Sequence, residues 1–124
     1  MWVIFINGYP FHENASWDEV EASIEALDSE TVTDVILAYY DLDHINLRAV
    51  GGDRLYVMLQ EPQVANYTLT DPSETEAISV YSQMYDTTIE APPSCFVRKL
   101  LARRAFQHFF EHGTRLPGVE WLVG

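Results

Sequence analysis

The chain has almost none of the features that support disulfide crosslinking, secretion or membrane insertion. Cys95 is the only cysteine among 124 residues, so no internal disulfide can form, and the thiol is best explained as a small buried hydrophobe. No segment approaches the ~20 apolar residues that a membrane helix needs. The apolar run Trp2–Ile6 has no basic leader and is too short for a signal peptide. We therefore expect a cytoplasmic protein without a membrane partner.

Basic residues are also scarce. Seven Lys and Arg face 19 Asp and Glu, which gives a net charge of −12. Residues 1–97 carry 17 acidic side chains and only Arg48 and Arg54 as basic ones. A field of this sign repels nucleic acid and accelerates encounter with basic partners. Nucleic acid is thus excluded as a partner, while solubility alone is the simpler alternative explanation of the charge.

Sequence motifs for catalysis are few. The chain lacks a phosphate loop, a dinucleotide fingerprint and a serine elbow. His108, Glu111 and His112 fit the His-x-x-Glu-His pattern of inverted zinc proteases. However, Gly113 ends the predicted helix at once, and Glu120 is the only downstream candidate for a third ligand. We therefore expect no metal, no cofactor and no catalytic residue, and a small zinc-dependent hydrolase is the alternative.

The hydrophobic pattern predicts an α+β fold. Length and a 48% hydrophobic composition indicate one folded domain over residues 1–124. Ser16 and Glu19 have the spacing of a capping box before a helix at 17–27, and a second helix is predicted at 98–112. Runs typical of strands lie at 2–7, 34–40, 45–49, 55–59, 77–82 and 118–122, with a possible edge strand at 67–69. The prediction is a single, mainly antiparallel sheet of about five strands, with two helices packed on one face.

Acidic residues gather in the predicted loops, and tyrosines lie among them. Tyrosine anchors within a charged rim are the usual composition of a tight protein interface. For each residue alone, a solvated loop position is the simpler alternative. The candidate partner-binding residues are Asp41, Asp43, Glu61, Tyr67, Glu74, Glu76, Tyr85 and Asp86.

The C-terminal third carries a family resemblance. The segment Pro93–Val97, an alanine-containing helix ending at Phe109–Gly113, and the segment Leu116–Trp121 follow one another at close spacing. Together they resemble bacterial polymorphic-toxin immunity proteins of the Imm-type family, which is commonly encoded beside nucleic-acid deaminase toxins. The strand-turn-strand around Gly51-Gly52 and the strand at 78–81 are similar in order and spacing. The resemblance covers residues 30–122 and carries over no site residue.

What the resemblance implies is a cytoplasmic, non-enzymatic inhibitor. Such a protein binds its cognate toxin domain as a monomer in a one-to-one heterodimer and occludes it. A deaminase that acts on a nucleic acid must hold a polyanion, so we expect its active-site cleft to be basic and to attract an acidic blocker. An acidic adaptor or nucleic-acid mimic with no link to a toxin is a further alternative.

Overall fold

The computed structural model describes residues 1–124 and contains strands, two α-helices and one short 3₁₀ helix. In chain order the elements are β1 (Trp2–Ile6), β2 (Tyr9–Glu13), α1 (Trp17–Glu25), β3 (Asp34–Tyr39), β4 (Asn46–Gly51), β5 (Arg54–Glu61), β6 (Ala65–Thr70), β7 (Ser79–Ser82), β8 (Thr87–Glu90), η1 (Pro93–Cys95), β9 (Phe96–Arg98), α2 (Lys99–His112) and β10 (Glu120–Val123).

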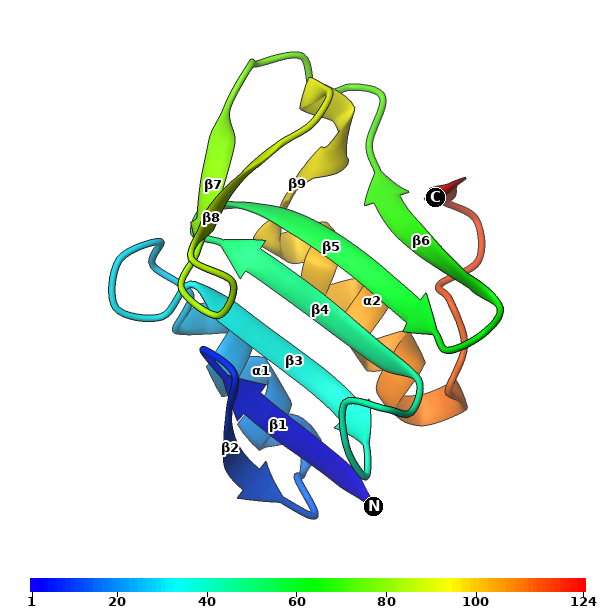
Figure 1. The fold of residues 1–124 in the computed structure, drawn as a ribbon. Helices are drawn as coiled ribbons and strands as arrows, with labels where there is room; N and C mark the ends of the chain where they lie inside the picture. The colour runs from blue at the N-terminus through cyan, green and yellow to red at the C-terminus, as the bar shows by residue number, and fades with distance from the viewer.

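The strands form one large antiparallel sheet and one separate hairpin. Seven strands lie in the order β10-β6-β5-β4-β3-β1-β2, and β9 pairs with β5 to make the sheet eight-stranded. Strands β7 and β8 pair only with each other, and their hairpin crosses the sheet near the start of β3 (Figure 1). Both helices lie behind the sheet in the same view, on its opposite face.

The α+β class and the two helices are confirmed, but the prediction of about five strands is wrong. The sheet has eight, and the segment expected at 77–82 belongs to the separate hairpin. Strand β2 contains Pro10, which lacks an N–H donor and weakens the strand signal. Strand β9 is three residues long and runs directly into α2. The edge strand expected at 67–69 is β6, which lies between β5 and β10.

The N-terminus of α1 and the C-termini of both helices are fixed by side-chain or backbone hydrogen bonds. The Ser16 hydroxyl accepts the Glu19 N–H, and the Glu19 carboxylate accepts the Ser16 N–H, so the predicted capping box is present. Helix α1 ends at Glu25, and the ammonium of Lys99 donates to the carbonyls of Glu25 and Leu27 at 3.0 and 2.7 Å. Helix α2 ends at Gly113, whose φ of +71° is the left-handed conformation that glycine adopts readily.

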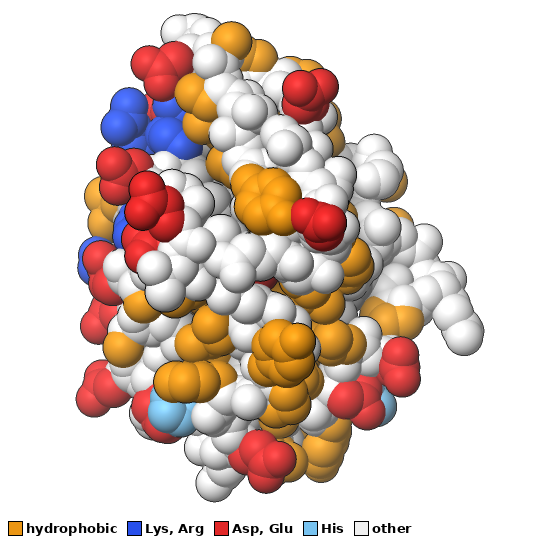
Figure 2. Space-filling model, turned by 60° about the vertical axis from the view of Figure 1, so that its left-hand side comes forward, with side chains coloured by type: hydrophobic (Ala, Val, Ile, Leu, Met, Phe, Trp, Pro, Cys, Tyr) orange, Lys and Arg blue, Asp and Glu red, His pale blue; other side chains and the backbone are white.

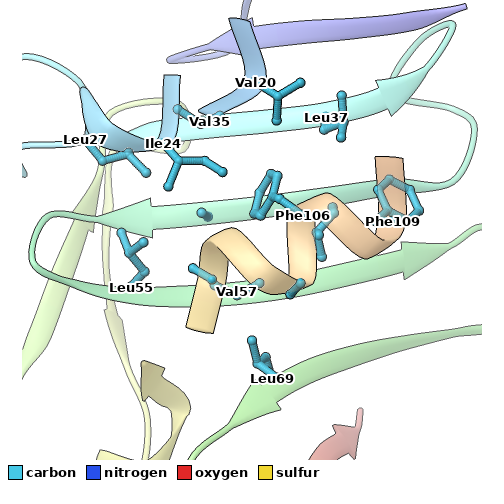
Figure 3. Close-up of a cluster of buried hydrophobic side chains, with 14 of the residues drawn as sticks. Val20, Ile24, Leu27, Val35, Leu37, Leu55, Val57, Leu69, Phe106 and Phe109 are labelled. Atoms are coloured by element: carbon cyan, nitrogen blue, oxygen red, sulfur yellow. The ribbon is translucent and has the colours of Figure 1, made fainter. Parts of the chain in front are cut away.

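The main core lies between the two helices and the sheet (Figure 3). Phe106 and Phe109 of α2 pack over β4 and β5, and Val20 and Ile24 of α1 face β3. All four are fully or almost fully buried. The inward side chains alternate along β5 as the sequence pattern predicts, with Leu55, Val57 and Leu59 all in this cluster.

The sheet face opposite the helices, here called the open face, is covered only in part by the β7–β8 hairpin. Two small clusters of buried hydrophobic residues lie on it, one on β1 and β3, the other under the hairpin. Strand alternation places Ile36 of β3, Arg48 of β4 and Met58 of β5 side by side on this face, because they are register partners. The open face is therefore a mixed surface of apolar and polar side chains.

A buried carboxyl group anchors the hairpin to the sheet. Asp34, the first residue of β3, is fully buried. Its two oxygens accept the Thr33 hydroxyl at 2.6 Å and the Ser82 hydroxyl at 2.7 Å. The Gln83 N–H donates to the Thr33 hydroxyl oxygen at 3.0 Å. The position of the β7–β8 turn over the open face thus depends on polar contacts at Asp34.

Candidate protein-binding surface

Three of the candidate acidic residues lie at one end of the sheet. The β3–β4 loop supplies Asp41 and Asp43, and the end of β5 supplies Glu61. The pairing of Asn46 with Gln60 brings these segments together. Asp43 and Glu61 line a shared polar depression of about 450 Å³. With the adjoining tyrosines, this set forms what we call the acidic rim: Tyr39, Tyr40, Asp41, Asp43 and Glu61.

Local hydrogen bonds hold Asp41 in its charged form. Its Oδ1 atom lies 2.7 Å from Nδ1 of His44 and accepts the Asp43 N–H at 2.9 Å. The hydrogen bond with the His44 side chain, followed by that from the Asp43 backbone, lowers the pKa of Asp41 below its ordinary value. The rim therefore keeps this negative charge in mildly acidic as well as neutral solution.

Two exposed aromatic side chains stand beside these carboxylates. Tyr39 and Tyr40 are 41% and 50% exposed, and their rings meet edge to face at 4.5 Å between centroids. Tyr40 has a φ of +74°, uncommon for a bulky residue, and its N–H donates to the Met1 carbonyl at 2.9 Å. The sequence pattern assigned both to a buried central strand. Their position directly before an acidic loop was the signal that could have identified them.

Tyr85 and Asp86 form a second exposed group in the turn of the β7–β8 hairpin. The Tyr85 ring packs against the Arg48 guanidinium, 4.6 Å from its centroid. The Tyr81 hydroxyl donates to Asp86, and this hydrogen bond raises the pKa of Tyr81. The hairpin thus carries these candidates to the border of the open face. Glu76 is exposed in the connection before β7.

Tyr67 and Glu74, in contrast, make intramolecular contacts away from the rim. Tyr67 packs against the main core on the helix side of β6, and the Arg115 guanidinium lies 3.8 Å from its ring centroid. The Glu74 carboxylate is 12% exposed and pairs with Arg54 at 2.8 Å and Arg98 at 3.5 Å. These two positions have clear structural roles.

Two glutamates of α1, Glu21 and Glu25, are partly neutralised within the chain. Arg103 of α2 lies 3.8 Å from Glu21 and 4.0 Å from Glu25. Figure 2 shows Lys and Arg side chains only along the left margin of that view, with acidic groups around a broad area of hydrophobic side chains. Glu21 and Glu25 thus have a basic partner, whereas no ion pair of the chain includes Asp43 or Glu61.

The histidine motif does not assemble a metal site. The rings of His108 and His112 lie 4.5 Å apart between centroids, and Nε2 of His108 lies 3.1 Å from the Thr114 hydroxyl. No group of three His, Cys, Asp or Glu side chains is arranged to hold a metal ion. Cys95 is buried, and burial raises the pKa of its thiol. The geometry thus offers no support for the hydrolase alternative.

Carboxylates with lowered pKa values make stability depend on pH in acid. Backbone N–H groups of Glu30, Val32 and Thr31 donate hydrogen bonds to Asp28 and lower its pKa. The hydrogen bonds to Asp41 lower the pKa of that carboxyl group in the same way. A depressed folded-state pKa stabilises the fold fully above the unfolded value of about 3.9 and loses that effect as pH falls through the folded value. We expect the thermal midpoint of unfolding to decrease when the pH is lowered below about 4. Asp28→Asn should flatten that decline, and parallel declines in both proteins would contradict the assignment.

These features define a small α+β protein built on one eight-stranded antiparallel sheet and two helices. Residues 12–122 match the family described as Immunity protein Imm1, and the chain belongs to this family. Imm1 is a family of non-enzymatic toxin inhibitors, so the chain is not an enzyme and its partner is a cognate toxin. A search of curated protein sequences gave no match. None of the helices is long and apolar enough to cross a membrane.

Proposed function

We propose that this Imm1 protein neutralises a nucleic-acid deaminase toxin in the cytoplasm by forming a one-to-one complex that blocks the active-site cleft. Residues 1–124 act as one binding domain. The observation that carries the proposal is the acidic rim, where Asp41, Asp43 and Glu61 surround one end of the sheet beside exposed Tyr39 and Tyr40.

The chemistry of the rim suits such a target. A deaminase that binds a polynucleotide presents cationic side chains along the path of the phosphates. Carboxylates at the rim attract that surface over about one Debye length and speed encounter. The tyrosine rings offer large, rigid contact area once the proteins meet. Charge supplies the rate, and the aromatic side chains supply the close contact.

Co-expression with the toxin domain encoded beside this chain tests the function. We expect the chain to restore growth of cells that make the toxin and to co-purify with the toxin in equimolar amount. In a purified assay, deamination of single-stranded DNA or RNA should fall to zero at one inhibitor per toxin. Binding without loss of deamination would contradict occlusion, and rescue from a toxin with no deaminase activity would contradict the toxin class.

A further inference from the structure

Arg48 occupies an unusual place for a charged residue. It lies in the middle of β4, a central strand, and its alternation with Leu47 and Ala49 directs it to the open face. Its neighbours across the strands are Ile36 and Met58. The residue is only 8% exposed. A guanidinium in such a position normally has a carboxylate or several carbonyl oxygens around it.

Arg48 has no such partner. Its Nε atom is buried and makes no hydrogen bond, and none of the ion pairs of the chain includes this residue. In a chain with 19 acidic residues, the lack of any paired carboxylate is notable. An unpaired buried charge is costly, so the free protein holds Arg48 in an unfavourable state that a ligand can relieve.

Arg54 provides the internal comparison. It lies on the same side of β5 as Met58 and is 9% exposed. Its Nε donates to the Phe96 carbonyl at 2.8 Å, and its terminal nitrogen lies 2.8 Å from Glu74. The fold therefore gives one buried arginine of this face a carboxylate partner and leaves the other without one.

The surroundings of Arg48 indicate what its ligand looks like. The Tyr85 ring lies against the guanidinium, with its centroid 4.6 Å from Cζ of Arg48, and the buried Nε in the guanidinium plane has no acceptor. A planar carboxylate accepts two parallel hydrogen bonds in that plane. The neighbouring open-face residues Asn46 and Gln60 also line the depression of the acidic rim. A partner bound at the rim would thus reach Asn46, which lies two residues from Arg48 on the same face of β4.

We propose that the open face around Arg48 is the anchor site for an aspartate or glutamate side chain of the toxin. The proposal rests on the proposed function and adds the contact that fixes orientation: the rim attracts a basic surface, and Arg48 selects the one acidic side chain within it. The carboxylate fills the in-plane donors of the guanidinium while Tyr85 stacks on its face. Phosphates are disfavoured as ligands because the field of the chain repels polyanions.

Matched arginine variants test the site against the purified toxin domain. We expect Arg48→Met to weaken binding at least about 30-fold, since it removes one partner of a buried charge pair. Its thermal midpoint should equal or exceed that of the wild type, because the unpaired charge is gone. Arg48→Lys, which keeps the charge without the planar fork, should weaken binding about tenfold. Arg54→Met should lower the thermal midpoint, and its folded form should bind within about threefold of wild type.

Two results would overturn the proposal while leaving the proposed function intact. One is Arg48→Met binding within about threefold of wild type. The other is a thermal midpoint for Arg48→Met as low as that of Arg54→Met, which would mean that Arg48 serves the fold. A third result would change the ligand: binding of a single-stranded oligonucleotide by the wild type and not by Arg48→Met would identify a phosphate, not a carboxylate, as the group that Arg48 binds. Failure of the wild type itself to bind the toxin domain would remove the function and the anchor together.

Discussion

Replacing Asp41, Asp43 and Glu61 together by lysine should slow association with the toxin domain about 100-fold at low salt. Each replacement changes the charge by two, so the net charge moves from −12 to −6, and the change falls at one end of the sheet. Local fields of this kind alter association rates by ~10 to 1,000-fold. Stopped-flow association at several salt concentrations measures the effect, which should shrink toward 0.5 M salt as screening increases.

The matched control reverses three exposed acidic residues elsewhere. Glu30, Asp53 and Glu90 lie in the α1–β3 connection, the β4–β5 turn and β8, and their replacement by lysine gives the same net charge. We expect this triple variant to slow association only about threefold, because steering depends on where the charge lies. Equal rates for the two triple variants would show that net charge alone acts and would remove the rim from the proposed contact surface.

We expect Asp34→Ala to lower the free energy of unfolding by about 3 kcal/mol. The carboxyl group accepts the hydroxyls of Thr33 and Ser82 in a fully buried position, and its loss leaves those donors unsatisfied. Each buried donor without an acceptor costs about 1–3 kcal/mol. Urea unfolding followed by circular dichroism measures the difference.

Ser82→Ala serves as the graded comparison for this network. It removes one donor and leaves the Asp34–Thr33 hydrogen bond in place, so we expect a loss of about 1 kcal/mol. Because the same contacts hold the hairpin, Asp34→Ala should also weaken toxin binding through displacement of Tyr85. Ordinary surface substitutions change the free energy of unfolding by about 0.5 kcal/mol or less. A change for Asp34→Ala within that range would contradict the role of Asp34.

Local sequence signals predicted the parts of the fold that depend on local physics. Gly51, the last residue of β4, has a φ of +132°, and a Cβ there would lie 2.4 Å from the Arg54 carbonyl oxygen, so the glycine that predicted this hairpin is required. The capping box at Ser16 and the end of α2 at Gly113 were predictable in the same way. Strands β2, β8 and β9 were missed because short, exposed or proline-containing segments gain their strand conformation from a neighbour.

The candidate surface residues also differ in whether local sequence could predict their roles. Asp41 and Asp43 were predictable as exposed because they follow a buried strand within a polar loop. Tyr67 and Glu74 find partners in Arg115 and Arg54, which are distant in sequence, so no local pattern could identify their roles. Arg48 is the opposite case. Alternation placed it on a strand, but only the assembled sheet reveals that no carboxylate reaches it.

Strand β2, at the edge of the sheet, has features that limit aggregation at high protein concentration. An edge strand offers free N–H and C=O groups to any chain that can add to the sheet, which is a common route to aggregation. Pro10 removes one donor, and the irregular register between Ile4 and Phe5 of β1 bends the pair. The exposed rings of Tyr9 and Phe11 make this protection necessary. We therefore expect the β2 edge to resist the addition of further strands from other copies of the chain.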